Sequence, residues 1–453
     1  MEVEVLETPD LGDRSYVAHD SELAIVIDPQ RDLERVEQVV AGRGLSVALV
    51  AETHVHNDYV TGGYDLAKRS GADYLVSAED DVEFTRRPVR DGDAIDVGRL
   101  RLHAISTPGH TFTHLAYVVT NADGPGAIFT GGSLLYGTVG RTDLLGAEHA
   151  GELARLQHRS ARQLAELLAD DVVVFPTHGF GSFCSAGGAT DSVNSTIGRE
   201  RSENVALIIE DEDAFVARLL SSYEAYPAYY ARMAPLNRRG PAAVSLGPVR
   251  RLGAEEVRGR ARSGEWVVDL RDRIAFARIH LAGTVSFPLE NTFSTYLGWL
   301  VPEGAPITLV APSEEELKAA RLQLARIGID ALAGASTGLI EALLDGTARD
   351  SYPVTTFARL SGLGEVALVD VRLDDEWRSG HIEGSLHIPL HELERRRDTL
   401  PSGPIAVHCA SGYRAGIAAS ILRRAGRDVV LVDDEWSNAE KAMPTRIEEE
   451  VPA

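Results

Sequence analysis

Short apolar runs and longer amphipathic stretches alternate along the first half of the chain. The apolar runs predict strands at 23–27, 45–50, 116–119, 127–130 and 172–175. The stretch 151–168 has apolar residues at helical spacing and predicts a helix. A segment rich in proline and glycine follows at 234–248 and has the composition of a linker. The pattern therefore predicts an α/β domain that ends near this linker.

The rest of the chain contains an internal repeat. The stretch 267–289, VVDLRDRIAFARIHLAGTVSFPL, matches the stretch 368–390, LVDVRLDDEWRSGHIEGSLHIPL, which lies 101 positions later. Six positions pair without a gap, and they are Asp269 with Asp370, Arg271 with Arg372, Phe276 with Trp377, His280 with His381, Gly283 with Gly384, and Pro288 with Pro389. A period of about 100 residues indicates duplicated domains, since solenoid repeats are much shorter. Each copy alternates strands with helices, which predicts a parallel sheet covered by helices on both faces.

The length of 453 residues exceeds what one hydrophobic core supports. The linker and the repeat divide the chain into three predicted domains, which are 1–240, 248–347 and 353–453. The fold class expected from this division is α/β and multidomain, with parallel sheets in the two repeat copies.

Composition narrows the class of partner. Aspartate and glutamate outnumber lysine and arginine by 68 to 45, and the net charge of −23 argues against nucleic acid and anionic membranes. There is no apolar run of about 18 residues that would span a membrane, and the acidic N-terminus lacks the apolar region of a secretory signal. The chain has two cysteines, Cys184 and Cys409, so disulfides do not hold the fold and we expect a cytoplasmic location.

One of these cysteines begins a loop that is suited to anions. The apolar run 405–408 predicts a strand, Cys409 follows it directly, and 415–424 predicts a helix. This order places the thiol at the carboxyl end of a parallel strand, where α/β folds carry their sites. Loop N–H groups and the helix dipole form an anion cradle there, which favours a thiolate. Gly412 lets the loop curl, and Arg414 adds a fixed positive charge. The alternative is that Cys409 is a small buried apolar residue.

The loop C-x-x-G-x-R, with DVR and GHIEGSLHIP upstream, resembles the rhodanese family. The resemblance implies a sulfurtransferase in which Cys409 forms an enzyme persulfide. It further implies a catalytic role for the loop residues Ser411, Gly412 and Arg414, and substrate contact by Tyr413. The chain departs from the family at 432–436, VDDEW, where a glycine pair often precedes the tryptophan. That departure bears on substrate preference.

The first copy of the repeat lacks this chemistry. When Pro306 is aligned with Pro404, Ala311 falls at the position of the cysteine. Glu314 and Glu316 then stand where the second copy has Gly412 and Arg414. A loop without a nucleophile and with added negative charge repels anions, so we expect this copy to be catalytically silent.

Histidines follow predicted strands repeatedly in the first domain. His54 and His56 lie in THVHNDY after the run 45–50, His110 lies in TPGHT, and His178 lies in PTHG after the run 172–175. Loops that follow strands bring such side chains together, and imidazoles bind first-row metals. The alternative for each histidine alone is a hydrogen-bonded loop residue.

These segments resemble the metallo-β-lactamase superfamily, and within it the persulfide dioxygenases that are fused to rhodanese domains. The resemblance implies an αββα sandwich and one metal ion, iron(II) or zinc. By position the ligands would be His54, His56 and His110, with Asp58 and His178 as second choices. Cys184 would be a substrate-contacting thiol near the metal.

Two departures from that pattern bear on the metal. Tyr59 replaces the last histidine of the His-x-His-x-Asp-His motif. Gly132, in FTGGS, stands where the family's TGD would place a metal-binding aspartate. The family's iron is held by two histidines, here His54 and His110, together with that aspartate. Imidazoles alone do not neutralise the charge of the ion, so metal affinity should drop and occupancy is left open.

Three functions follow from these observations. The first is an enzyme of persulfide metabolism that transfers sulfur at Cys409 among persulfides, sulfite and thiosulfate, while the first domain oxidises a glutathione-type persulfide to sulfite. The second keeps the sulfurtransferase and makes the first domain a metal-poor binding module. The third is a thioester hydrolase of the glyoxalase II type, which Gly132 and Tyr59 disfavour. We expect small-molecule partners and neither nucleic acid nor membrane, and the oligomeric state is left open.

Overall fold

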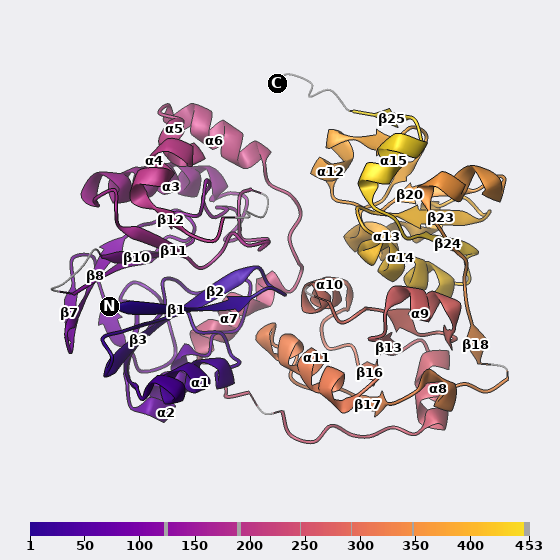
Figure 1. Cartoon of the computed structure of the whole chain (residues 1–453), viewed down its shortest axis with the longest axis horizontal. Coiled ribbons are helices and arrows are strands. Elements are labelled where there is room, and N and C mark those ends of the chain that lie inside the picture. Colours follow the sequence, from indigo (N-terminus) through magenta and orange to yellow (C-terminus); the bar gives the residue numbers. More distant parts are fainter. Residues whose placement is uncertain (122–125, 188–191, 245, 291, 347, 448–453) are drawn as a thin grey trace. The chain divides into compact units, whose positions relative to one another are not determined.

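A computed structural model describes residues 1–121, 126–187, 192–244, 246–290, 292–346 and 348–447 (Figure 1). Its contacts divide the chain into two compact units. The first unit comprises Met1–Ser245 with Leu322–Ile329, and the second comprises Leu246–Arg321 with Asp330–Ala453. The finer boundaries expected from the sequence at 240, 248, 347 and 353 stay predictions.

The first unit contains two six-stranded sheets. The first sheet has the order β1 (Glu2–Thr8), β2 (Asp13–His19), β3 (Leu23–Ile27), β4 (Ser46–Ala51), β5 (Asp73–Ser77) and β6 (Arg87–Val89). The second has the order β12 (Ser195–Thr196), β11 (Val173–Pro176), β10 (Ala127–Gly131), β9 (Leu115–Asn121), β8 (Leu100–Ser106) and β7 (Ala94–Val97). Parallel pairing of β3 with β4 and of β10 with β11 brings their carboxyl ends to common edges.

The main core of this unit lies between the two sheets. Buried residues from both sheets form it, among them Ile25, Leu49, Tyr117 and Phe129. Helices α1 (Glu34–Arg43) and α2 (Gly63–Ser70) pack on the outer face of the first sheet. Helices α3 (Ala150–Leu167) and α6 (Glu212–Ser221) pack on the outer face of the second sheet. These layers confirm the expected αββα sandwich.

The remaining helices of the unit are α4 (Ile197–Glu203), α5 (Val205–Ile208) and α7 (Tyr230–Arg239). The predicted strands at 23–27, 45–50 and 127–130 agree with β3, β4 and β10 to within one residue at either end. The predicted helix at 151–168 is α3, shifted by one residue. The histidine loops follow β4, β8 and β11, as expected from the strand ends.

The second unit contains two parallel sheets, one for each copy of the repeat. The first copy has the order β15 (Val285–Ser286), β13 (Trp266–Asp269), β16 (Ile307–Ala311) and β17 (Gly334–Thr337). The second copy has the order β19 (Val354–Thr355), β24 (Val429–Val432), β23 (Ile405–His408), β20 (Ala367–Asp370) and β22 (Leu386–His387). Two short antiparallel ladders join β14 (His280–Leu281) to β18 (Arg349–Asp350) and β21 (His381–Ile382) to β25 (Thr445–Arg446).

Helices alternate with these strands. They are α8 (Ala254–Arg262), α9 (Arg273–Arg278), α10 (Phe293–Leu300), α11 (Glu314–Arg326), α12 (Asp374–Ser379), α13 (Leu393–Arg396), α14 (Tyr413–Arg424) and α15 (Trp436–Ala442). The part of α11 from Leu322 onward is assigned to the first unit. Short 3-10 turns are η1 (Ile340–Ala342), η2 (Phe357–Leu363), η3 (Leu390–Glu392) and η4 (Arg397–Thr399). Among the described residues, no helix combines the length and apolar character that a membrane crossing needs.

Sheet register supports the alignment of the two copies at the cysteine position. Asp269 pairs with Val310 in the first copy, and Asp370 pairs with His408 in the second. The residue that follows each partner is therefore Ala311 in one copy and Cys409 in the other.

The matched positions of the repeat have the same structural roles in both copies. Arg372 holds Asp370 through two guanidinium nitrogens, and Arg271 holds Asp269 in the same way. The stacked pair of Trp377 and His381 likewise corresponds to that of Phe276 and His280, with ring centroids 3.8 and 4.0 Å apart. The matched positions of the repeat therefore make the same packing contacts in both copies.

Candidate functional site

Four buried histidines meet at the strand ends of the first unit, and a fifth, His114, stacks on His54 with ring centroids 4.9 Å apart. His54 and His56 come from the loop after β4, His110 from the loop after β8, and His178 from the loop after β11. The ring of His54 lies 4.2 Å from that of His56, 4.8 Å from that of His110 and 5.3 Å from that of His178, measured between centroids. The structure thus gathers the three predicted ligands and adds His178 to the same cluster.

Hydrogen bonds fix which nitrogen of His54 and His110 is free. Nδ1 of His110 lies 2.7 Å from the carbonyl oxygen of Arg141, which accepts only, so this nitrogen carries the proton. Nδ1 of His54 lies 2.9 Å from Oγ1 of Thr53, whose own proton goes to Asp28. Both rings therefore present Nε2 as an unprotonated atom. Metal-binding histidines are oriented in this way by a partner on their other nitrogen.

Carboxylates bracket the other two imidazoles. The partners are Asp28 and Glu52 for His56, both at 3.2 Å, and Asp13 and Asp58 for His178, at 2.9 and 3.2 Å. Burial opposes protonation of both rings, but these carboxylates outweigh it and raise the pKa of His56 to about 9 and of His178 to about 10. By contrast, burial and the charge of His178 lower the pKa of His110 to about 3.

Gly132, where the family resemblance predicts an aspartate, is closely packed against its neighbours. A Cβ built on Gly132 would overlap the imidazole of His110. The N–H of Gly132 donates to Nε2 of His114 at 3.0 Å, and Nδ1 of His114 lies 2.8 Å from Oγ1 of Thr107. His114 therefore uses both ring nitrogens and has none left for a metal. A carboxylate at position 132 has no room in this arrangement.

We expect Gly132→Ala to lower the free energy of unfolding of the first unit by about 1–3 kcal/mol, because the added methyl group overpacks the site against His110. Gly151→Ala is the matched control, since a Cβ there meets nothing within 4 Å and residue 151 lies in helix α3. That control should be neutral or stabilising. Urea denaturation measures both, and equal behaviour of the two variants would contradict the close packing at Gly132.

Cys184 lies in the histidine cluster. Its side chain is fully buried, and its sulfur lies within 4.8 Å of a ligand atom of His110 and of one of His178, which are equally close to each other. Burial and the carboxylates of Asp58 and Asp13 raise the pKa of this thiol. The sequence predicted a thiol near the metal, and the structure places it among the candidate ligands. Its contact with substrate stays a prediction.

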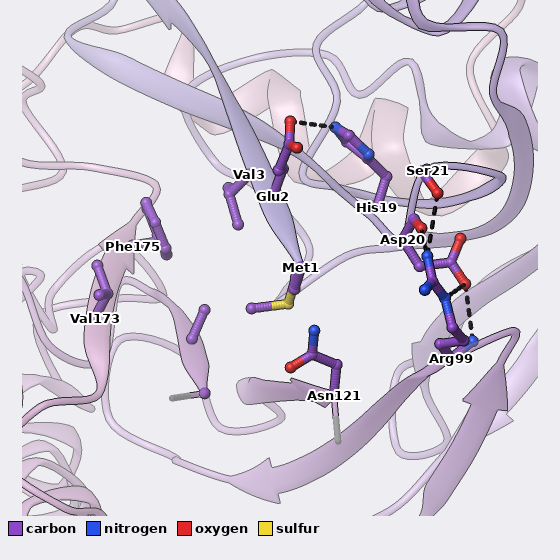
Figure 2. Close-up of a pocket in the computed structure, with 12 residues that line it drawn as sticks. Met1, Glu2, Val3, His19, Asp20, Ser21, Arg99, Asn121, Val173 and Phe175 are labelled. Carbon is purple, nitrogen blue, oxygen red and sulfur yellow. Dashed lines mark hydrogen bonds and ion pairs between the residues drawn. The ribbon is translucent and has the colours of Figure 1, made fainter. Parts of the chain in front are cut away.

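A cavity of about 640 Å³ opens elsewhere in the first unit (Figure 2). Its wall includes Met1, His19, Arg99 and Phe175, and Asp20 holds the N–H of residue 99 at 2.8 Å. Neither the four clustered histidines nor the two cysteines line it. The volume of this cavity therefore does not identify a reaction centre.

In the second unit, Cys409 follows β23 and faces the first turn of α14. Its Sγ accepts hydrogen bonds from the N–H groups of Gly412, at 3.2 Å, and of Ala415, at 3.4 Å. Gly412 has φ of +92°, and a Cβ there would collide with the carboxylate of Asp433. Two amides and a helix N-terminus stabilise negative charge on the sulfur. The loop expected from the sequence is present.

Arg414 of the same loop is held by a carboxylate. Its guanidinium binds Glu376 of α12 at 2.5 and 2.7 Å, and it lies near Tyr296 of α10. Burial opposes ionisation of Glu376, but the ion pair lowers the pKa of this carboxyl. Tyr413 uses its hydroxyl to donate to the carbonyl oxygen of Pro288, at 3.2 Å. Substrate contact by Tyr413 and the anion-binding role of Arg414 stay predictions.

Two stretches of the chain match known families, and each stretch contains residues of one of the two sites. Residues 10–178 match the metallo-beta-lactamase superfamily, and residues 354–442 match the rhodanese-like domain. The chain joins a metallo-beta-lactamase domain to a rhodanese-like domain. The first match ends at His178 of the histidine cluster, and the second contains the Cys409 loop.

Curated relatives of the metallo-beta-lactamase domain have two kinds of name. Hydroxyacylglutathione hydrolase of Methylobacillus flagellatus is 31% identical over 128 residues, which are 28% of this chain and 49% of that protein. Human mitochondrial persulfide dioxygenase ETHE1 is 28% identical over 205 residues, which are 45% of this chain and 72% of that protein. This chain thus spans about half the length of the hydrolase.

A solved structure extends the likeness beyond one domain. The metallo-beta-lactamase from Staphylococcus aureus subsp. aureus COL is 26% identical, with a TM-score of 0.67. The alignment covers 75% of this chain and 99% of that one. The likeness therefore extends into the second unit, since 75% of the chain is more than the first unit contains.

The metallo-beta-lactamase fold, the persulfide dioxygenase relatives and the histidine cluster together indicate a metal site. The donor atoms fit such an ion. Within the described residues, Nε2 of His110 is buried and has no hydrogen-bond partner, and Nε2 of His54 lies 3.4 Å from Nε2 of His178. Residue 132, where the family resemblance predicts an aspartate ligand, is glycine, so the fit rests on the imidazoles and the thiol of the cluster.

The first copy of the repeat contributes to the rhodanese-like domain's loop. Arg273 of α9 binds Asp433 at 2.6 Å, and its Nη2 donates to the carbonyl oxygen of Ser411 at 3.3 Å. Asp433 belongs to the stretch VDDEW at 432–436. Arg273 therefore anchors the rim of the Cys409 loop from the other copy. One feature of the sequence points to this role of Arg273. The matched position in the second copy is Asp374, so the two copies have opposite charges there.

We expect Arg273→Ala to slow sulfur transfer while lowering stability by only about 0.2–1 kcal/mol, since this ion pair is partly exposed. Arg278→Ala, an exposed position on the same helix, is the matched control. Steady-state assays with thiosulfate and cyanide measure the rate of transfer. The same assays over a range of pH show whether the rate depends on the charges of the Arg273–Asp433 pair. Identical rates in the two variants would remove Arg273 from the loop's support.

Proposed function

We propose that this chain is an enzyme of sulfur metabolism whose rhodanese-like domain transfers sulfane sulfur through Cys409. The observation that carries the proposal is the pair of N–H groups, of Gly412 and Ala415, that point at Sγ of Cys409. These donors stabilise a thiolate, which is the form that attacks sulfur. The match of residues 354–442 to the rhodanese-like domain supports the same chemistry.

The transfer has two balanced steps. The Cys409 thiolate attacks the outer sulfur of thiosulfate, the S–S bond of thiosulfate breaks, and sulfite leaves with the bonding electron pair. The enzyme then holds a persulfide, whose outer sulfur passes to a nucleophile such as cyanide or a thiolate, and the Cys409 thiolate returns. Only 1% of Cys409 is exposed, so the donor must enter past surface residues of the loop such as Ser411.

Mass spectrometry of the full chain tests this proposal. Incubation with thiosulfate should add one sulfur atom to the peptide that carries Cys409, and cyanide should remove it with release of thiocyanate. Sulfur on another residue, or none at all, would overturn the assignment. Small persulfides replace thiosulfate in a second series, because the preferred donor is part of the proposal.

A second candidate function concerns the metallo-beta-lactamase domain. It would convert a small persulfide, O2 and water into the thiol and sulfite, as the name of the human relative suggests. In that case His54 and His110 would help to hold iron, which would activate O2. The protein would orient the persulfide and exclude bulk water. The close packing at Gly132 leaves no room for the aspartate ligand that the family resemblance predicts. The alternative is therefore a metal-poor module that binds persulfides.

Oxygen uptake decides between these alternatives. Iron-dependent consumption of O2 with glutathione persulfide would support oxidation, while persulfide binding without uptake would support the module. Hydrolysis of a glutathione thioester is the third outcome, which the hydroxyacylglutathione hydrolase relatives keep in the comparison. Such hydrolysis normally uses two metal ions bridged by a carboxylate, a group that Gly132 does not supply.

A further inference from the structure

The metal site of the first unit lacks its expected anionic ligand but contains another anion-forming group. Imidazoles leave the charge of a divalent ion unneutralised, and Gly132 cannot correct this. Cys184 lies on the loop after β11 and is buried in the histidine cluster. A thiol that loses its proton to a metal supplies one negative charge and a strong, soft donor.

Three ligand atoms already lie close enough together for one ion. A ligand atom of His110, one of His178 and the sulfur of Cys184 are all within 4.8 Å of one another, and all three residues are buried. His110 can use only Nε2, because its Nδ1 donates to Arg141. That Nε2 is the buried atom without a hydrogen-bond partner among the described residues. His110 thus combines an unpaired buried acceptor with a ligand atom that lies within 4.8 Å of the thiol and of His178, and a metal would satisfy such an acceptor.

The main chain of Arg141 ties two of these ligands together. Its carbonyl oxygen accepts from Nδ1 of His110 at 2.7 Å, and its N–H donates to the carbonyl oxygen of Cys184 at 2.9 Å. One peptide segment therefore sets the spacing of imidazole and thiol. The guanidinium of Arg141 is fixed in turn by Asp143, at 2.7 Å. Such support of ligands by hydrogen-bonded neighbours is typical of metal sites.

We propose that Cys184 is a metal ligand, and that it forms with His110 and His178 a thiolate-containing site for a divalent ion of the zinc class. His54 stands beside this set, with Nε2 3.4 Å from Nε2 of His178. A ligand set of two imidazoles and a thiolate is typical of zinc. Iron that activates O2 is usually held by histidines together with a carboxylate. The proposal does not rest on sulfur transfer at Cys409, which belongs to the other unit.

Cobalt(II) tests the proposal in the full chain. Thiolate coordination to Co²⁺ gives a charge-transfer band in the near ultraviolet, which histidine coordination alone does not give. We expect this band when Co²⁺ is added to chelator-treated protein, and we expect Zn²⁺ to abolish it by competition. Because the chain has two cysteines, Cys184→Ser should remove the band and Cys409→Ser should keep it. Loss of a group that supports a metal ligand lowers metal affinity by roughly 10–100-fold. Loss of the ligand itself in Cys184→Ser should lower the affinity for Zn²⁺ by at least as much.

Three outcomes would overturn the site. They are failure of the chain to bind Co²⁺ or Zn²⁺, binding without the charge-transfer band, and a band that Cys409→Ser removes. If Cys184→Ser does not fold, X-ray absorption of the zinc-loaded wild-type chain decides instead. A sulfur shell at about 2.3 Å would support thiolate ligation, and a shell of nitrogen and oxygen alone would refute it.

Discussion

Replacing Cys409 by serine is expected to abolish sulfur transfer from thiosulfate to cyanide, with a fall on the order of 10⁴-fold or more, as happens when a catalytic nucleophile is lost. The hydroxyl of serine does not ionise at neutral pH, so the N–H groups of Gly412 and Ala415 have no thiolate to stabilise. The rate of thiocyanate formation under saturating substrates measures the loss.

A control variant separates chemistry from folding in this experiment. Ser402→Ala changes an exposed residue of the same domain and should keep the wild-type rate. Thermal unfolding of both variants should give similar midpoints, because a serine fits where Cys409 stands. Retention of more than a few per cent of the activity in Cys409→Ser would assign the reaction to another group.

Asp370→Ala is expected to destabilise the second unit by about 3–5 kcal/mol, the cost of leaving a buried charge without its partner. The side chain of Arg372 is 3% exposed and binds Asp370 through two nitrogens. Its guanidinium also stacks on the ring of Trp436 at 3.6 Å, and the N–H of Trp436 donates to the carbonyl oxygen of Ala410. We therefore expect slower sulfur transfer as well, because the Cys409 loop loses a supporting contact.

The duplicated copy supplies a matched comparison for that variant. Asp269→Ala breaks the corresponding pair with Arg271, whose side chain is 13% exposed, so we expect a smaller loss of stability. The first copy has Ala311 at the cysteine position but supports the Cys409 loop through Arg273, so this variant should slow transfer less than Asp370→Ala does. Urea denaturation and the thiocyanate assay report the two effects separately. An equal fall in rate in both variants would show that general destabilisation explains the result.

The order of strands and helices follows closely from the apolar pattern. Runs such as 23–27 and 127–130 are buried on both faces of their sheets, and burial on both faces produces a continuous apolar run. The strands β14 and β21 have two residues each, too few to form such a run, and their pairing with β18 and β25 arises from tertiary packing. Helix α14 begins at Tyr413, two residues before the predicted start, since the loop already turns at Gly412.

The candidate sites were predictable where chemistry follows a strand. His54, His110 and His178 were found in this way, and Asp28, which directly follows β3, obeys the same rule and was missed. Other partners could not be read locally. Glu376 reaches Arg414 across 38 positions, and that pairing depends on how α12 packs. The fully buried position of Cys184 likewise arises from tertiary packing.

Anchoring of the Cys409 loop by the first copy limits how freely the last domain can be moved to another protein. Excision at residue 353 would strip away Arg273, the Pro288 carbonyl that receives Tyr413, and the N–H of Ser286 that donates to Ser420 at 2.9 Å. A fusion protein that uses this domain should therefore include both copies of the repeat. The same contacts give the first copy, which has Ala311 at the cysteine position, a structural role that needs no nucleophile.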